Sequence, residues 1–92
     1  MQFAARLRDQ IRRGEITTTI RIWQSPRVKA GGAYRLAPGH VVVDHIREIS
    51  IADITPQMAR ESGFSGTIDL LKTARHGAGT RVFFIRFHYE ES

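Results

Sequence analysis

The sequence predicts an α+β fold in which a small, curved, mostly antiparallel sheet is flanked by short helices. With 92 residues, the chain is long enough for one hydrophobic core and too short for two, so residues 1–92 are expected to form a single domain. The apolar fraction of 41% is ordinary for a folded protein. Residue patterns predict several short strands and few helices, an arrangement typical of a sheet covered by helices.

Residues 2–13 are expected to form the first helix. An apolar stripe recurs at helical spacing, and Gly14 follows as a stop signal. The stripe consists of Phe3, Ala4, Leu7 and Ile11. The arginines beside it are typical of a solvent-exposed helix face.

Residues 16–23 follow as a predicted strand rich in β-branched side chains. Strand alternation places Ile16, Thr18, Ile20 and Ile22 on one face, which we expect to face the core. The opposite face carries Thr17, Thr19, Arg21 and Trp23. This second face could line a binding site. Alternatively, its threonines only favour the strand, Arg21 is a solvent-exposed charge and Trp23 fills the core.

The remaining elements are predicted by their turn and cap residues. A short strand at 33–37 and a long strand at 41–51 are separated by a tight turn. A short helix is expected with Thr55 as its N-cap, Pro56 as its first residue and Gly63 as its stop. A second helix is expected from Gly66 to His76, ended by the glycines at 77–79, and a last strand at 80–90. The inward residues of that second helix are expected to be Ile68, Leu71 and Ala74.

The charge of the chain favours a polyanionic partner. The formal net charge is +5, and arginine supplies 12 of the 14 cationic side chains. Because the planar guanidinium binds phosphate through paired hydrogen bonds and stacks on bases, this bias favours nucleic acid. A basic surface that only keeps the protein in solution is the alternative.

Metal, cofactor and membrane partners are not expected. The chain has no cysteine, which excludes disulfides and thiolate zinc sites. His40 and His45 are five residues apart on a strand, so they are expected on opposite faces, and His76 and His88 have no carboxylate partner at ligand spacing. The first residues lack an apolar stretch long enough for a signal peptide or membrane span, so a cytoplasmic location is expected.

Three segments resemble the ASCH domain family, which belongs to the PUA-like superfold. They are "GEITTTIR" (14–21), "VKAGGAYRL" (28–36) and "VVVDHIREISIADITPQMARESGF" (41–64). The resemblance covers nearly the whole chain, from the first helix to the closing "VFFIRF". It implies a small PUA-like β-barrel, and members of this superfold mostly bind RNA or modified nucleosides.

The family motif is a glycine, a lysine two residues on, a glutamate three further and an arginine two after that. Gly14 and Arg21 match, whereas Ile16 stands at the lysine position and Thr19 at the glutamate position. Small bacterial relatives that deacetylate acetylcytidine also carry a threonine there, and they use the lysine in catalysis. The resemblance places their catalytic glutamate near Glu61 or Ser62.

The leading hypothesis is an RNA- or nucleotide-binding module with a basic cleft beside the strand from Ile16 to Trp23. Arg21 would contact phosphate or base, Thr17 and Thr19 would orient the ligand, and Trp23 would offer a stacking plane. The positive charges that attract the ligand would be Arg27, Lys29 and Arg35.

Two alternatives remain open. One is an amidohydrolase, or another RNA-directed hydrolase, that acts on acylated nucleosides with Thr19 and Glu61 as catalytic residues. Because Ile16 replaces the motif lysine, binding is more expected than catalysis, and Glu61 could instead be an ordinary helix-surface charge. The other alternative is a protein-interaction module with an apolar patch around Trp23.

Overall fold

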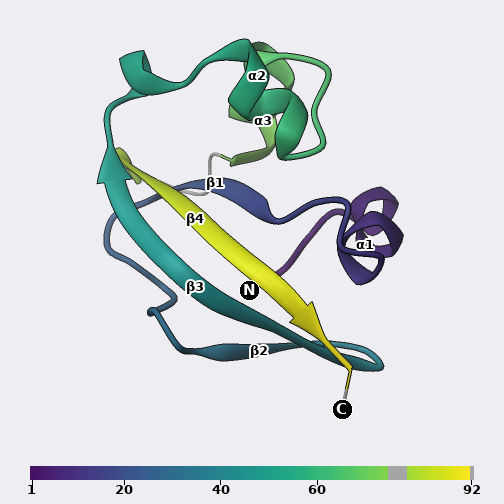
Figure 1. Cartoon of the computed structure of the whole chain (residues 1–92). Coiled ribbons are helices and arrows are strands. Elements are labelled where there is room, and N and C mark those ends of the chain that lie inside the picture. Colours follow the sequence, from purple (N-terminus) through teal and green to yellow (C-terminus); the bar gives the residue numbers. More distant parts are fainter. Residues whose placement is uncertain (75–78, 92) are drawn as a thin grey trace.

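The computed structural model, which describes residues 1–74 and 79–91, has an α+β fold built on one curled antiparallel sheet (Figure 1). The strands lie in the order β1-β4-β3-β2, so the last strand lies between the first and the third. The sheet forms a half-barrel, and β1 and β2 are its two edges. The elements in chain order are α1 (Ala5–Arg12), β1 (Thr18–Trp23), β2 (Ala33–Leu36), β3 (Gly39–Ile49), a 3-10 turn (Ile51–Asp53), α2 (Pro56–Glu61), α3 (Thr67–Ala74) and β4 (Arg81–Glu90).

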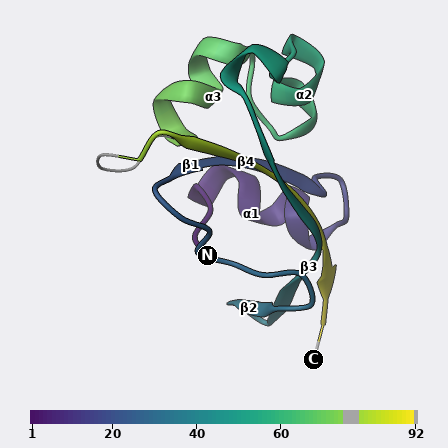
Figure 2. The ribbon, with the colours of Figure 1, turned by 90° about the vertical axis from the view of Figure 1, so that its left-hand side faces the viewer.

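Helices cover both faces of the sheet. Figure 2 shows α1 on one side of the strands and α2 and α3 on the other. Helix α1 packs through Leu7 and Ile11 against Val41 and Phe87 of the concave face. Helices α2 and α3 cover the opposite face, and the core there consists of Ile20, Ile22, Ile54, Ala59, Leu70, Ala74, Val82 and Phe84. We call this second face the outer face.

The strand alternation predicted for residues 16–23 is confirmed only within the strand, because Ile20 and Ile22 pack on the outer face whereas Ile16, which precedes the strand, packs with α1. Ile16, Thr18, Ile20 and Ile22 are all buried. The strand itself begins at Thr18, and every one of its residues is buried, which includes the face expected to be polar and open. The reason is that the segment before α1 lies against that face, as the contacts of Arg21 below show.

A β-bulge in β3 decides which of its side chains face outward. Val43 lies opposite Phe87 and His45 lies opposite Arg86, so Asp44 is an extra residue on β3. A bulge of this kind shifts the alternation by one residue. The bulge was not predicted from the sequence.

The expectation that His40 and His45 face opposite sides is therefore wrong. His40 lies opposite Glu90 and His45 opposite Arg86, and these two β4 residues share one face. The extra residue between the two histidines brings both of them to the outer face. The same shift directs Arg47 outward and Ile46 inward, where Ile46 packs beside the concave-face core.

The caps of α2 form as predicted. The Thr55 Oγ1 accepts a hydrogen bond from the Met58 amide at 3.1 Å, and Pro56 is the first helical residue. Gly63 has a φ of 94°, a backbone conformation that glycine adopts without steric cost, and the chain turns there.

The inward face of α3 differs from the prediction at two positions, because Leu70 takes the place expected for Ile68. Leu70 and Ala74 are buried, whereas Ile68 is 71% exposed. Since residues two apart on a helix point in nearly opposite directions, burying Leu70 turns Ile68 to solvent. Leu71 packs at the margin of the core, as expected. The predicted end of the helix at His76 and the following glycines lie largely outside the described residues.

Candidate functional site

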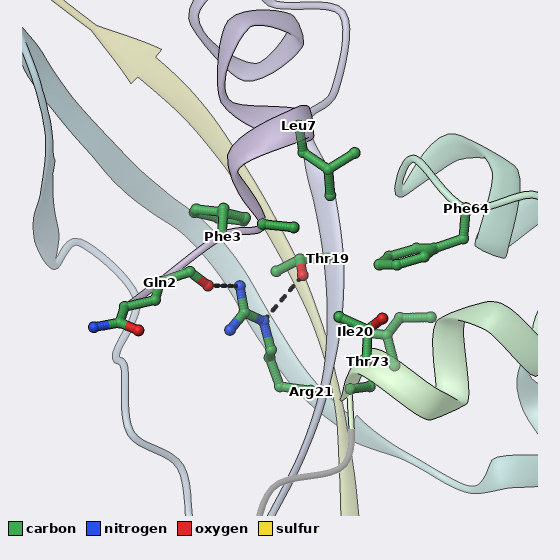
Figure 3. A pocket seen from close by; sticks show the side chains of 10 residues that line it. Gln2, Phe3, Leu7, Thr19, Ile20, Arg21, Phe64 and Thr73 are labelled. Atoms are coloured by element: carbon green, nitrogen blue, oxygen red, sulfur yellow. Dashed lines mark hydrogen bonds between the residues drawn. The ribbon is translucent and has the colours of Figure 1, made fainter.

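The guanidinium of Arg21 is the centre of the candidate site. Its side chain leaves β1 on the concave face and is 9% exposed. Its Nε donates a hydrogen bond to Thr19 Oγ1 at 3.1 Å, and its Nη2 donates to the Gln2 carbonyl oxygen at 2.5 Å. The group also lies over the ring of Phe3, with 4.9 Å between its central carbon and the ring centroid. Figure 3 shows these contacts at the junction of β1 and the segment before α1.

No carboxylate in the described part of the chain neutralises Arg21. The ion pairs there join other residues. The remaining nitrogen, Nη1, has no hydrogen-bond partner among the described residues, and it points away from Thr19 in Figure 3. Burial lowers the pKa of Arg21 to about 10, which leaves it charged at neutral pH. Because a buried charge without a counter-ion is costly, this position favours an anionic ligand.

Two cavities meet at Arg21. The first, of about 260 Å³, lies between the segment before α1, β1, α3 and the end of α2. We call it the aromatic cavity, because Phe3 and Phe64 lie on opposite sides of it (Figure 3). The second has a volume of about 340 Å³ and is lined in part by Trp23 and Arg27. We call it the basic cavity.

The first residues of the chain form part of the wall between the two cavities. Gln2 and Arg21 line both of them, and the Gln2 carbonyl holds the guanidinium in place. Arg21 thus borders both cavities, and Thr19, bonded to its Nε, lines the aromatic cavity.

Main-chain groups of β1 also face the aromatic cavity side. The Phe87 amide donates to the Thr17 carbonyl at 2.9 Å, which makes these two residues a hydrogen-bonded pair across β1 and β4. In an antiparallel ladder such pairs alternate, so the N–H and C=O of Ile20 point away from β4 to the open edge of the sheet. Because Ile20 lines the aromatic cavity, we expect these groups to offer it one donor and one acceptor.

The structure brings together four of the residues predicted for the site. Thr19 and Arg21 are hydrogen-bonded to each other, and Trp23 and Arg27 line the basic cavity next to Arg21. Trp23 is 3% exposed and packs on Phe83, with the ring centroids 5.9 Å apart. Its ring is thus mostly covered, and only a small part of it borders the cavity.

The other predicted residues lie elsewhere. Thr17, Lys29, Arg35 and Glu61 are exposed, and none of them lines either cavity. Arg35 alternates on β2 with Tyr34 and Leu36, which pack against the core, so it points away from the concave face.

Sequence reasoning missed the residues that close the aromatic cavity. Phe3 was predicted only as part of a helical stripe, and it precedes α1 while remaining buried. Phe64 follows the α2 stop, and Gln2 contributes a main-chain oxygen that no side-chain pattern reveals. Ser62, next to Glu61, is also buried and bonds to Thr18 Oγ1 at 3.0 Å.

Neither cavity has a described side chain suited to act as a general base. Among the described residues, the linings contain no histidine, lysine or carboxylate. No group of three or more potential ligands in residues 1–74 and 79–91 could hold a metal ion. None of the described helices is both long and apolar enough to cross a membrane.

Comparison of the chain with family models, curated proteins and solved structures finds no match. The geometry around Arg21 is therefore the basis for a functional proposal.

Proposed function

We propose that this chain binds a nucleotide, or a nucleotide unit of single-stranded RNA, at the junction of the two cavities. The observation that carries the proposal is the Arg21 guanidinium, which is buried, charged and without a carboxylate partner among the described residues. Arginine in such a position is suited to a phosphate group, because its planar donors match the oxygens of the anion.

The two cavities suit the two parts of a nucleotide. In the proposed complex, the base enters the aromatic cavity, where Phe3 and Phe64 offer ring surfaces for stacking. The main-chain N–H and C=O of Ile20 would bond to the edge of the base. The phosphate would lie in the basic cavity, in reach of the free Nη1 of Arg21 and of Arg27.

The resemblance to the ASCH family is consistent with this proposal. Gly14 and Arg21 match the family motif, and a PUA-like fold is in keeping with a curled antiparallel half-barrel. Ile16, at the motif lysine position, is buried against α1 and offers no catalytic group. We therefore favour binding over hydrolysis of an acylated nucleoside.

Titration calorimetry with uridine 5′-monophosphate and with a short single-stranded RNA tests the proposal. We expect the Arg27→Gln variant to lose about tenfold in affinity, as for one charge-assisted hydrogen bond. The logarithm of its binding constant for the RNA should also fall less steeply with the logarithm of the salt concentration, by about 0.7 in slope for each lost phosphate contact. Trp23 is the single tryptophan and borders the basic cavity, so its fluorescence should report occupancy.

Arg35→Gln is the matched control, because it removes the same charge from a side chain that lines neither cavity. It should bind as the unmodified protein does at moderate salt. Arg21→Lys keeps the charge but loses the paired donors of the planar guanidinium, so it should bind more weakly. A cooperative unfolding transition would show that this variant is still folded. The absence of binding heat with both ligands, or equal losses in Arg27→Gln and Arg35→Gln, would contradict the proposal.

A further inference from the structure

The outer face of the sheet carries a third hollow, separate from the two Arg21 cavities. It has a volume of about 390 Å³ and lies over β3 and β4. Four residues line it: His45, Arg47, Phe84 and Arg86. We call this hollow the outer groove.

The bulge at Asp44 brings the polar residues of the outer groove together. His45 lies directly opposite Arg86, and Arg47 lies directly opposite Phe84. Without the extra residue, His45 and Arg47 would point to the concave face, away from Arg86. Bulges often re-aim side chains at functional sites, and this one gathers two arginines and a histidine around one depression.

The floor of the outer groove is apolar and belongs to the core. Phe84 is part of the core beneath α2 and α3, and only its outer surface reaches the groove. The Arg47 guanidinium lies over this ring, with 5.5 Å between its central carbon and the ring centroid. The ring holds one face of the cation and leaves its edge, which carries the N–H donors, free to bind a ligand.

The carboxylates near the outer groove are already engaged. Asp44 and Glu90 each bond to His88 at 2.7 Å, on its two ring nitrogens. Asp53 accepts hydrogen bonds from the Ser50 amide and hydroxyl, which lower its pKa, and the charge of Arg47 adds a smaller effect in the same direction. The side chain of Arg86 has no ion pair or hydrogen bond with another described residue.

We infer that the outer groove is a second anion site, which takes a phosphate group between Arg47 and Arg86. Diagonal neighbours on adjacent antiparallel strands are close enough for one small anion to bond to both side chains. Two guanidinium groups on one depression repel each other unless an anion lies between them, and phosphate offers the oxygens that match both. His45 completes the ring of nitrogen donors around the hollow. This inference is independent of the proposed nucleotide site, which lies at the β1 edge of the sheet and shares no lining residue with the outer groove.

Backbone amide NMR of the full chain tests the outer groove. In the first arm, inorganic phosphate replaces chloride stepwise at constant ionic strength. In the second arm, a short single-stranded RNA is added instead. We expect saturable shifts at His45, Arg47 and Arg86. Shifts with inorganic phosphate would identify a site for a free phosphate group, and shifts with RNA alone would identify a site for a phosphodiester. Either result supports the proposal, and no saturable shift in both arms overturns it.

Variants separate this site from the Arg21 cavities. Arg86→Gln should weaken phosphate binding in the groove about tenfold, while shifts around Arg27 are unchanged. Arg60→Gln, which removes an equal charge from an exposed residue of α2 outside the groove, should bind phosphate normally. Equal weakening in these two variants would overturn the proposal, because it would show that only net charge matters. If the phosphate-induced shifts near Arg27 are missing while those at His45, Arg47 and Arg86 remain, the result counts against the nucleotide site and supports the outer groove.

Discussion

The hydroxyl groups of Thr18 and Ser62 lie 3.0 Å apart in the interior, where they join β1 to the residue that follows α2. Ser62 is 2% exposed, and no fully buried polar side-chain atom among the described residues lacks a partner. The contact therefore links two segments more than forty residues apart by a satisfied buried hydrogen bond.

A double-mutant cycle measures this link. Thr18→Val or Ser62→Ala alone should lower the free energy of unfolding by about 1–3 kcal/mol, because each leaves the other hydroxyl buried and unpaired. The double variant should lose less than the sum of the two, since no orphaned hydroxyl remains. Urea denaturation gives the three values, and losses that add within about 0.5 kcal/mol would show that the two groups do not interact.

Thr19 is expected to support the Arg21 guanidinium. Thr19→Val keeps the shape of the side chain but removes the acceptor of the Nε hydrogen bond, so stability should fall by about 1–3 kcal/mol. Thr19→Ser keeps the oxygen and should lose less. Thermal and chemical unfolding of both variants checks the order, and a serine variant as unstable as the valine variant would contradict a role for the hydroxyl.

Gly63 is expected to tolerate no side chain. Its φ is 94°, and a Cβ atom there would lie 2.6 Å from Leu7 Cδ2 and 2.9 Å from Ile16 Cδ1. Gly63→Ala should cost at least about 1 kcal/mol from backbone strain, with an additional cost from displacing these core side chains. Gly66→Ala is the control, because a Cβ atom at Gly66 meets nothing within 4 Å. Equal stability of the two variants would be inconsistent with this packing.

His88 is expected to titrate above its ordinary pKa of 6.5. Hydrogen bonds to Asp44 and then to Glu90 favour the imidazolium and raise its pKa. A group whose pKa is raised on folding stabilises the fold fully below pH 6.5 and loses that contribution as the pH rises through the folded value. NMR titration of the imidazole should show a lower pKa in Asp44→Asn and in Glu90→Gln, and an unchanged value in both would refute the pairing.

The sequence predicted the elements that are determined by neighbouring residues alone, such as helix caps and strand alternation. Thr55 and Pro56 begin α2 as expected, since cap chemistry depends on neighbouring residues alone. The core face of β1 followed from alternation within a few residues. The α+β class and the curled antiparallel sheet are also confirmed, since several short strands and few helices in a short chain favour this class.

Features that depend on distant contacts were not predictable in this way. The expectation that His88 has no carboxylate partner is wrong: Glu90 bonds to it from two residues along β4, and Asp44 reaches it through the pairing of β3 with β4 and the bulge between them. His76, included in the same expectation, lies outside the described residues. Arg21 lies on the predicted strand face, but its burial depends on Gln2 and Phe3, which lie in the segment before α1.

The extra residue at Asp44 makes the length of β3 as important as its composition. If Asp44 alone were deleted, the side chains before it and after it on β3 could not both keep their present faces of the sheet. Either the buried Val41 and Val43 would turn to solvent, or Ile46 would turn outward and Arg47 would enter the core. Proteins of this architecture that differ by one residue here would thus present a different chemical surface on both sides of the sheet, with every other side chain unchanged.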